Sequence, residues 1–192
     1  IIKKGSMVND VYNRIAQLGI DTSNPNLIPV PSMALGVFDL SVFNIVSASA
    51  AFANHGIYIE PVYLLRIEDK FGNVIFQAEQ EARQVWNKET AYTMLEMMKL
   101  VTRGVKHPTL KNKNNRPLIG GTAIRIRSIE SKKQPYAGIS QPIAGKTGTT
   151  QNQSDGWFMG LTPELVTGVW VGAEDRSVRF RTLSQGMGTN TA

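Results

Sequence analysis

Apolar residues recur along the chain with two periods, and the change of period marks the predicted elements. A stripe with helical spacing predicts a helix over residues 9–18, formed by Val8, Val11, Tyr12, Ile15 and Leu18. Residues 41–54 predict a second helix with Ser41 as its cap, and because it is apolar almost all round we expect it in the core. A further stripe predicts a third helix between Asn87 and Gly104.

Short runs rich in β-branched and aromatic residues predict strands. Residues 57–60 and 63–68 are expected to be extended, and a turn at 69–73 returns the chain into a partner strand at 74–76. Gly72 suits the positive φ that such a turn requires.

Three later runs predict consecutive antiparallel strands at 142–150, 156–161 and 166–172. A polar loop separates the first two, and Thr162-Pro163-Glu164 forms the turn before the third.

The segments between these elements are rich in Pro, Gly, Asn and basic residues. Residues 21–36 contain Pro25, Pro29 and Pro31 and predict a loop. We expect a mobile loop at 105–119 and a polar connector at 131–140. Between them, a short helix is expected to start at Gly120-Gly121 and run to 129.

Composition is that of a globular protein with an excess of positive charge. The 192 residues carry a formal net charge of +6, which favours anionic partners such as phospholipid headgroups, an anionic wall polymer or nucleic acid. No zinc spacing or ribonucleoprotein pattern accompanies the basic residues, which argues against nucleic acid, and solvated loop charge is the simpler explanation. The absence of cysteine excludes a disulfide framework and thiol chemistry.

The sequence contains no run near the ~20 apolar residues of a membrane span, and no secretory signal. The chain starts without Met, so we interpret it as a piece of a longer protein, and the absent signals say nothing about location.

The chemistry of the chain is concentrated on the first of the three late strands. Lys146 supplies a positive charge, and Thr147 and Thr149 lie two residues apart, so their hydroxyls point to the same side of a strand. Gly148 between them allows a ligand or another backbone to approach closely. This combination suits a ligand with a carboxylate, although an ordinary strand with a surface lysine remains the alternative.

The motifs around this strand resemble the transpeptidase domain of penicillin-binding proteins, in particular the class A bifunctional enzymes. Lys-Thr-Gly is a motif of penicillin-binding proteins and class A β-lactamases. The likeness covers nearly the whole chain, and these segments carry it: Pro31-Ser32-Met33-Ala34-Leu35-Gly36, Ala51-Phe52-Ala53-Asn54-His55-Gly56, Ala144-Gly145-Lys146-Thr147-Gly148-Thr149-Thr150, Asp155-Gly156-Trp157-Phe158-Met159-Gly160 and Gly168-Val169-Trp170-Val171-Gly172.

The resemblance implies an α+β fold, in which helices flank an antiparallel sheet of five strands as in the penicillin-binding proteins and serine β-lactamases. By this pattern residues 1–192 are the C-terminal part of a single transpeptidase domain. Three of the five strands lie in the chain, and the other two precede it.

The implied activity is a serine D,D-transpeptidase that cross-links peptidoglycan stem peptides through an acyl-enzyme and is acylated by β-lactam antibiotics. The family's nucleophile lies in a Ser-x-x-Lys motif and is assisted by Ser-x-Asn, and this sequence contains neither. The chain is therefore expected to be inactive without the remainder of its domain.

Roles carry over by resemblance to the Lys-Thr-Gly strand. Lys146 contributes charge and hydrogen bonding near the nucleophile, and the hydroxyls of Thr147 and Thr149 bind the terminal carboxylate of a D-Ala-D-Ala peptide or a β-lactam. The Thr149 N–H forms half of the oxyanion hole, and Gly148 belongs to the same motif. Trp157 would pack behind this strand or serve simply as core, and Asp155 would pair with a cation or form a turn.

The resemblance also implies a membrane-anchored parent protein with an N-terminal glycosyltransferase domain, located on the outer, periplasmic face of the bacterial cytoplasmic membrane. No metal or organic cofactor is implied. Two alternatives stay open: a serine β-lactamase-like hydrolase and a non-catalytic penicillin-binding-like module. His55, just past the second predicted helix, is interpreted as part of its C-terminal cap.

Overall fold

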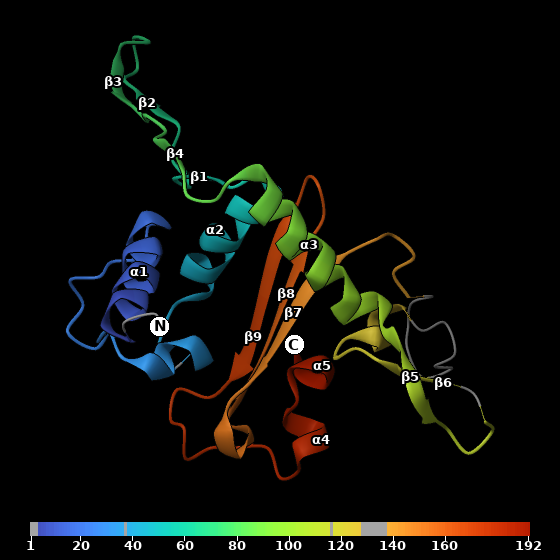
Figure 1. The fold of residues 1–192 in the computed structure, drawn as a ribbon. Coiled ribbons are helices and arrows are strands. Elements are labelled where there is room, and N and C mark those ends of the chain that lie inside the picture. Colours follow the sequence, from blue (N-terminus) through green and yellow to red (C-terminus); the bar gives the residue numbers. More distant parts are fainter. Residues whose placement is uncertain (1–3, 37, 116, 128–137) are drawn as a thin grey trace. The chain divides into compact units, whose positions relative to one another are not determined.

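The computed structural model describes residues 4–36, 38–115, 117–127 and 138–192, and it has a mixed fold of helices and antiparallel sheets (Figure 1). The chain divides into two compact units, Ile1–Lys88 and Glu89–Ala192. Within the described ranges, no helix is both long and apolar enough to cross a membrane.

The first unit contains the predicted helices α1 (Lys4–Gln17) and α2 (Val42–Ala53). Helix α1 starts earlier than residue 9, whereas α2 has the predicted limits. A capping box starts α2, because the Ser41 hydroxyl accepts a hydrogen bond from the Asn44 N–H (3.1 Å) and the Asn44 side chain accepts from the Ser41 N–H. The loop predicted between the two helices contains one short helical turn, η1 (Pro31–Leu35).

Helix α2 is not enclosed as its composition predicts. Ala51 is its only buried residue, and Phe43 is 54% exposed. The expectation that α2 lies in the core is therefore wrong for the described residues, because too few of them pack around it. His55 follows the helix with φ +54°, and the Gly56 N–H donates to the Ala51 carbonyl, which is the expected C-terminal cap geometry.

A small core holds this unit together. Ala51, Tyr58 and Val85 form a buried cluster, against which Leu18 and Trp86 pack. Two short strands bring these residues together: β1 (Ile57–Ile59) pairs antiparallel with β4 (Ala82–Gln84), a strand that the sequence did not predict.

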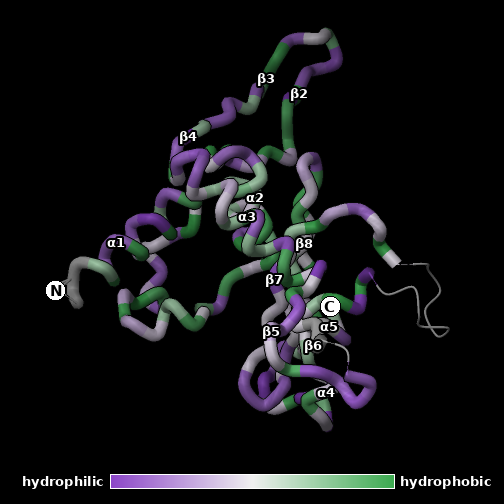
Figure 2. Tube along the Cα trace, turned by 45° about the vertical axis from the view of Figure 1, so that its right-hand side comes forward, coloured by the Kyte–Doolittle hydropathy of each residue, from purple (hydrophilic) through white to green (hydrophobic). Residues whose placement is uncertain are grey.

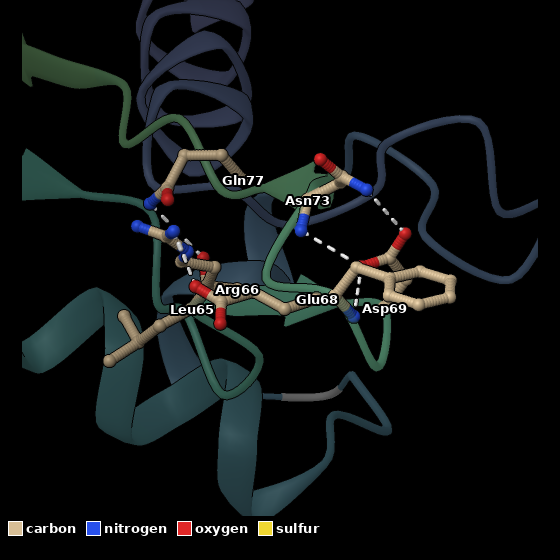
Figure 3. Close-up of polar contacts among 7 residues, drawn as sticks. Leu65, Arg66, Glu68, Asp69, Asn73 and Gln77 are labelled. Atoms are coloured by element: carbon tan, nitrogen blue, oxygen red, sulfur yellow. Dashed lines mark hydrogen bonds and ion pairs between the residues drawn. The ribbon is translucent and has the colours of Figure 1, made fainter.

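A β-ribbon extends from β1 and β4, with the predicted strands β2 (Arg66–Glu68) and β3 (Val74–Gln77) and the predicted turn between them. Asp69 organises the turn by accepting hydrogen bonds from the N–H groups of Phe71 and Asn73, each 2.8 Å, and from the Asn73 amide (Figure 3). These bonds, the Asn73 side chain first, hold the pKa of the Asp69 carboxyl below its usual value. Apolar stretches lie on both strands of the ribbon (Figure 2), and Ile75 is 68% exposed.

The second unit is built on a three-stranded antiparallel sheet in the order β7-β8-β9. Strands β7 (Ala144–Thr149), β8 (Asp155–Leu161) and β9 (Val166–Gly172) confirm the three predicted late strands. The predicted turn between the last two is closed by the Thr162 N–H, which donates to the Leu165 carbonyl (2.9 Å). Helix α3 (Lys88–Arg103) follows Asn87, as predicted.

Residues 105–119 correct the prediction of a mobile loop. They form most of an antiparallel ribbon of β5 (Val105–Lys111) and β6 (Pro117–Gly120). Asn115, at φ +59°, closes the turn by donating its N–H to the Asn112 carbonyl (3.0 Å). Asn tolerates this left-handed conformation, so the Asn-rich stretch is a turn rather than a flexible linker.

Four short helical turns complete the described elements. The turn η2 (Ile124–Arg127) lies where a helix was expected from 120 to 129, and the connector expected at 131–140 lies mostly outside the described residues. The sequence did not predict η3 (Gln151–Gln153), α4 (Leu183–Gly186) or α5 (Gly188–Thr191).

Candidate functional site

The Lys-Thr-Gly residues lie on β7, at one edge of the three-stranded sheet. The register pairs Thr147 with Phe158 and Gly148 with Trp157 on β8. No strand among the described residues pairs with the other side of β7, so this edge is open.

The hydrogen-bond pattern decides which backbone groups of β7 face the open edge. The Thr150 N–H donates to the Asp155 carbonyl (3.3 Å), which makes this a hydrogen-bonded pair. In an antiparallel ladder such pairs alternate along the strand, so Gly148 bonds to β8, whereas Thr147 and Thr149 direct their N–H and C=O groups outward. The Thr149 N–H is therefore oriented as a donor toward anything bound along this edge.

Side chains alternate across the same strand. Thr147 and Thr149 lie on one face, as predicted, and Lys146 and Gly148 lie on the other. The Lys146 side chain nevertheless reaches the open edge, because its ammonium donates to the outward-facing Thr147 carbonyl. Neither ion pair found among the described residues includes Lys146, whose side chain is exposed.

Thr147 is hydrogen-bonded to a residue that the sequence did not single out. Its hydroxyl donates to the Thr122 hydroxyl at 2.8 Å. Thr122 follows Gly121, which packs against the end of α3: a side chain at Gly121 would lie 2.9 Å from the Gly104 Cα and 3.0 Å from the Leu100 carbonyl oxygen. The glycine before Thr122 thus allows the close approach that brings its hydroxyl to β7.

Thr149 is hydrogen-bonded to the start of α5. Its hydroxyl accepts from the Gly188 N–H (3.1 Å), which leaves the hydroxyl proton free to be donated to a ligand. Gly188 packs against the paired backbone of Gly148 on β7 and Trp157 on β8. A Cβ added to Gly188 would lie 2.3 Å from the Gly148 carbonyl oxygen. In the sequence, the small residue at position 188 is the only feature that indicates this contact between α5 and β7.

Helices α3 and α5 both contact the threonine face of the sheet: a Cβ on Gly145 would lie 3.1 Å from the Thr102 methyl of α3, and Gly188 of α5 is bonded to Thr149. At the α3 end, the buried Thr102 hydroxyl donates to the Ile143 carbonyl just before β7 (2.5 Å). At the other end, Arg125 of η2 donates to Asn190 of α5, so the two segments that contact Thr147 and Thr149 are joined to each other.

Trp157 and Asp155 lie on β8 and support β7 from behind. Trp157 lies against Gly148 and contacts Trp170, with ring centroids 6.5 Å apart. Asp155 is 9% exposed, and its N–H donates to the Thr150 hydroxyl (3.0 Å) at the turn between β7 and β8. Its Oδ1 is buried and has no hydrogen-bond partner among the described residues.

Comparison with known proteins defines the class of this site. A family model described as "Penicillin binding protein transpeptidase domain" matches residues 16–174, and the chain belongs to that family. The fold is accordingly α+β, with helices on an antiparallel sheet, as the resemblance predicted.

The curated relatives include penicillin-binding proteins 1A, 1B and 2D. Penicillin-binding protein 1A of Aquifex aeolicus is 29% identical over 161 residues, which cover 84% of this chain and 19% of that protein. Penicillin-binding protein 1A of Neisseria lactamica is 32% identical over 154 residues, covering 77% of this chain and 16% of that protein. The chain thus spans about a fifth of the length of its curated relatives.

Solved structures share the fold. Penicillin-binding protein 1A from Haemophilus influenzae superposes with a TM-score of 0.66 at 22% identity, over 90% of this chain and 27% of that one. The PonA1 protein from Mycobacterium tuberculosis, solved in complex with penicillin V, gives a TM-score of 0.61 at 23% identity, over 94% of this chain and 45% of that one.

Proposed function

We propose that this chain forms the carboxylate-binding side and half of the oxyanion hole of a serine D,D-transpeptidase that cross-links peptidoglycan. The observation that carries the proposal is the open edge of β7. There a lysine ammonium, the threonine hydroxyls and an outward N–H converge within Lys146 to Thr149.

Each group has a chemical task that fits its geometry. The hydroxyls of Thr147 and Thr149 donate to the terminal carboxylate of the peptide or of a β-lactam, and Lys146 adds positive charge beside it. Hydrogen bonds to a charged group are worth about 1.5–3 kcal/mol each. The Thr149 N–H stabilises the negative oxygen that forms when the peptide carbonyl is attacked.

The reaction has two steps. A serine hydroxyl forms an ester with the carbonyl carbon of the D-Ala-D-Ala bond while the C–N bond breaks, and the serine proton leaves with the terminal D-Ala. An amine of a neighbouring stem peptide then forms an amide with the same carbonyl carbon while the ester C–O bond to serine breaks, and the amine proton goes to the serine oxygen. The 192 residues contain no Ser-x-x-Lys, so the serine belongs to the remainder of the same domain.

The comparisons support a parent protein of the same kind as the relatives. We assign this chain to a single transpeptidase domain because one model of that domain matches residues 16–174, and the relatives are about five times longer than the matched segment. The parent protein is membrane-anchored, with a glycosyltransferase domain, and acts on the outer face of the cytoplasmic membrane.

The test is acylation by penicillin. In the full-length protein, Lys146→Ala is expected to slow acylation by about 10²-fold, because charged donors at such sites contribute about 10²–10³ in rate. Lys70→Ala, an exposed lysine in the turn of the β2–β3 ribbon, is the matched control and should acylate normally. Equal acylation of both variants would refute the role of Lys146.

A second measurement separates a transpeptidase from a lactamase and from a non-catalytic module. A fluorescent penicillin should label the full-length protein with a stable ester. Rapid loss of the label would indicate a hydrolase, and no label at all would indicate a binding module.

A further inference from the structure

The β5–β6 ribbon lies in the most basic part of the chain. Residues 97–129 contain eight Lys and Arg residues and no Asp or Glu, so this stretch alone accounts for more than the net charge of +6. A surface with a single sign of charge attracts polyanions.

Four of these charges are exposed and available to a ligand: Arg103, Lys106, Lys111 and Lys113. Neither ion pair found among the described residues includes any of them. By contrast, Lys99 pairs with Glu96 at 2.6 Å, and Arg127 donates to the Ser140 carbonyl at 3.0 Å.

His107 adds a further polar side chain to the same ribbon. Its Nδ1 accepts hydrogen bonds from the N–H groups of Thr109 (3.2 Å) and Leu110 (2.9 Å). An acceptor Nδ1 requires the proton of the neutral ring to lie on Nε2, so the exposed ring presents an N–H to solvent.

Both ends of the ribbon are fixed beside the Lys-Thr-Gly strand. The residue two positions before Gly104, Thr102, donates to the Ile143 carbonyl, and Thr122 after β6 is hydrogen-bonded to Thr147. The Ala123 N–H also donates to the Val101 carbonyl (2.9 Å), which closes the base of the ribbon. A ligand on β7 therefore lies next to the base of this ribbon, from which the lysines of β5 extend.

We propose that the β5–β6 ribbon binds the anionic peptidoglycan strand whose peptide is held on β7. This rests on the proposed function and adds a second contact to the same substrate. A seven-residue strand extends about 20 Å, which is too long for one carboxylate but suits a polymer with repeated carboxylates. The fixed base beside β7 favours the substrate polymer over a lipid surface or a phosphate polymer.

The experiment compares two triple variants of the full-length protein. The ribbon variant is Lys106→Gln, Lys111→Gln and Lys113→Gln, and the control is Lys70→Gln, Lys88→Gln and Arg179→Gln, which removes the same charge from other exposed positions. Co-sedimentation with insoluble peptidoglycan, freed of attached phosphate polymers, is measured at 0.1 M salt. The ribbon variant should bind roughly tenfold more weakly than the control variant, and the difference should vanish at about 1 M salt.

Penicillin labelling separates failure of this inference from failure of the proposed function. Penicillin should label the wild type, the ribbon variant and the control variant equally, because the ribbon lysines take no part in acylation. Equal labelling with equal sedimentation of the two variants would overturn the inference and leave the proposed function intact, whereas an unlabelled wild type would overturn both.

Two further probes test the other polyanions. If the ribbon variant loses binding only to phosphatidylglycerol vesicles, the surface binds lipid, and the inference is wrong. It is also wrong if binding is lost only to peptidoglycan that retains its phosphate polymers.

Discussion

Thr147 shows how the role of one side chain depends on a residue 25 positions away. The motif places its hydroxyl on β7, but the Thr122 hydroxyl fixes the direction in which it points. Because either hydroxyl can rotate, Thr122 can donate to Thr147 once Thr147 donates to a bound carboxylate. We therefore propose that Thr122 positions the Thr147 hydroxyl.

Thr122→Val should weaken penicillin binding before acylation by about two- to tenfold, since an intramolecular hydrogen bond contributes about 0.5–1.5 kcal/mol. The rate of the acylation step itself should change little. Thr122→Ser keeps the hydroxyl and should restore binding. Stopped-flow kinetics on the full-length protein resolve the two steps, and a valine variant with the affinity of the serine variant would contradict this role.

The residues of the candidate site were only partly predictable. The sequence predicted the strand that carries Lys146 to Thr149 and the shared face of the two threonines, because alternation along a strand is fixed by its backbone. Thr122 and Gly188 lie far away in the sequence from the residues they contact. Only packing at Gly121 and over Gly148 brings them close, and no spacing rule reports such packing.

At the scale of elements, strong periodicity and clear caps made α2, α3 and the three late strands predictable. The sequence did not predict the β5–β6 ribbon, because Pro108 and the basic residues of the ribbon interrupt the alternation of apolar and polar residues that marks a strand. Strand β4 and helix α5 are too short to show a period, and tertiary contacts form them: β4 pairs with β1, and α5 packs on β8. A helix or strand can be predicted from its own residues best when it is long enough for the hydrophobic period to repeat.

Helix α5 gives a prediction at this scale through Gly188. In Gly188→Ala the methyl carbon would lie 2.3 Å from the Gly148 oxygen and 2.4 Å from the Trp157 oxygen, so α5 must move away from β7. Such overpacking costs about 1–3 kcal/mol. The midpoint of denaturation of the full-length protein should therefore fall. Acylation by penicillin should also be slower, because Thr149 loses the N–H that orients its hydroxyl.

Gly120→Ala is the matched control for this substitution. Gly120 lies at the end of β6, and its nearest neighbour for an added carbon is the Val105 oxygen, 4.0 Å away. Its midpoint and acylation rate should match those of the wild type. If Gly188→Ala behaves the same way, α5 does not hold Thr149.

At the scale of the whole molecule, the described residues leave much apolar surface uncovered. In the part of the chain that the structure describes, both outer strands of the sheet lack partners on one side, and on β9 Val169 is 44% exposed. Helix α2 is likewise only half-buried. The resemblance implied a domain of five strands, three of which lie in this chain, and this uncovered surface is what the remaining strands and helices would bury.

Residues 1–192 produced alone should therefore form no covalent adduct with penicillin and should melt without a cooperative transition. The first expectation follows from the missing Ser-x-x-Lys, and the second from exposed strand edges, which also favour aggregation. Intact mass spectrometry and calorimetry measure the two outcomes. A stoichiometric adduct would refute the assigned nucleophile, and a monomer with a sharp melting transition would refute the incomplete domain.

The ribbon closed by Asp69 has a practical consequence. Its ladder is held by bonds outside the turn, among them the one from the Ala78 N–H to the Leu65 carbonyl (2.9 Å), so a change at the tip leaves these bonds in place. Phe71 at the tip is 78% exposed, and Gly72 has open space around it. Exposed tips of this kind tolerate insertions well. A fluorophore or short epitope introduced between these two residues would allow the protein to be followed in living cells while its β7 edge stays unmodified.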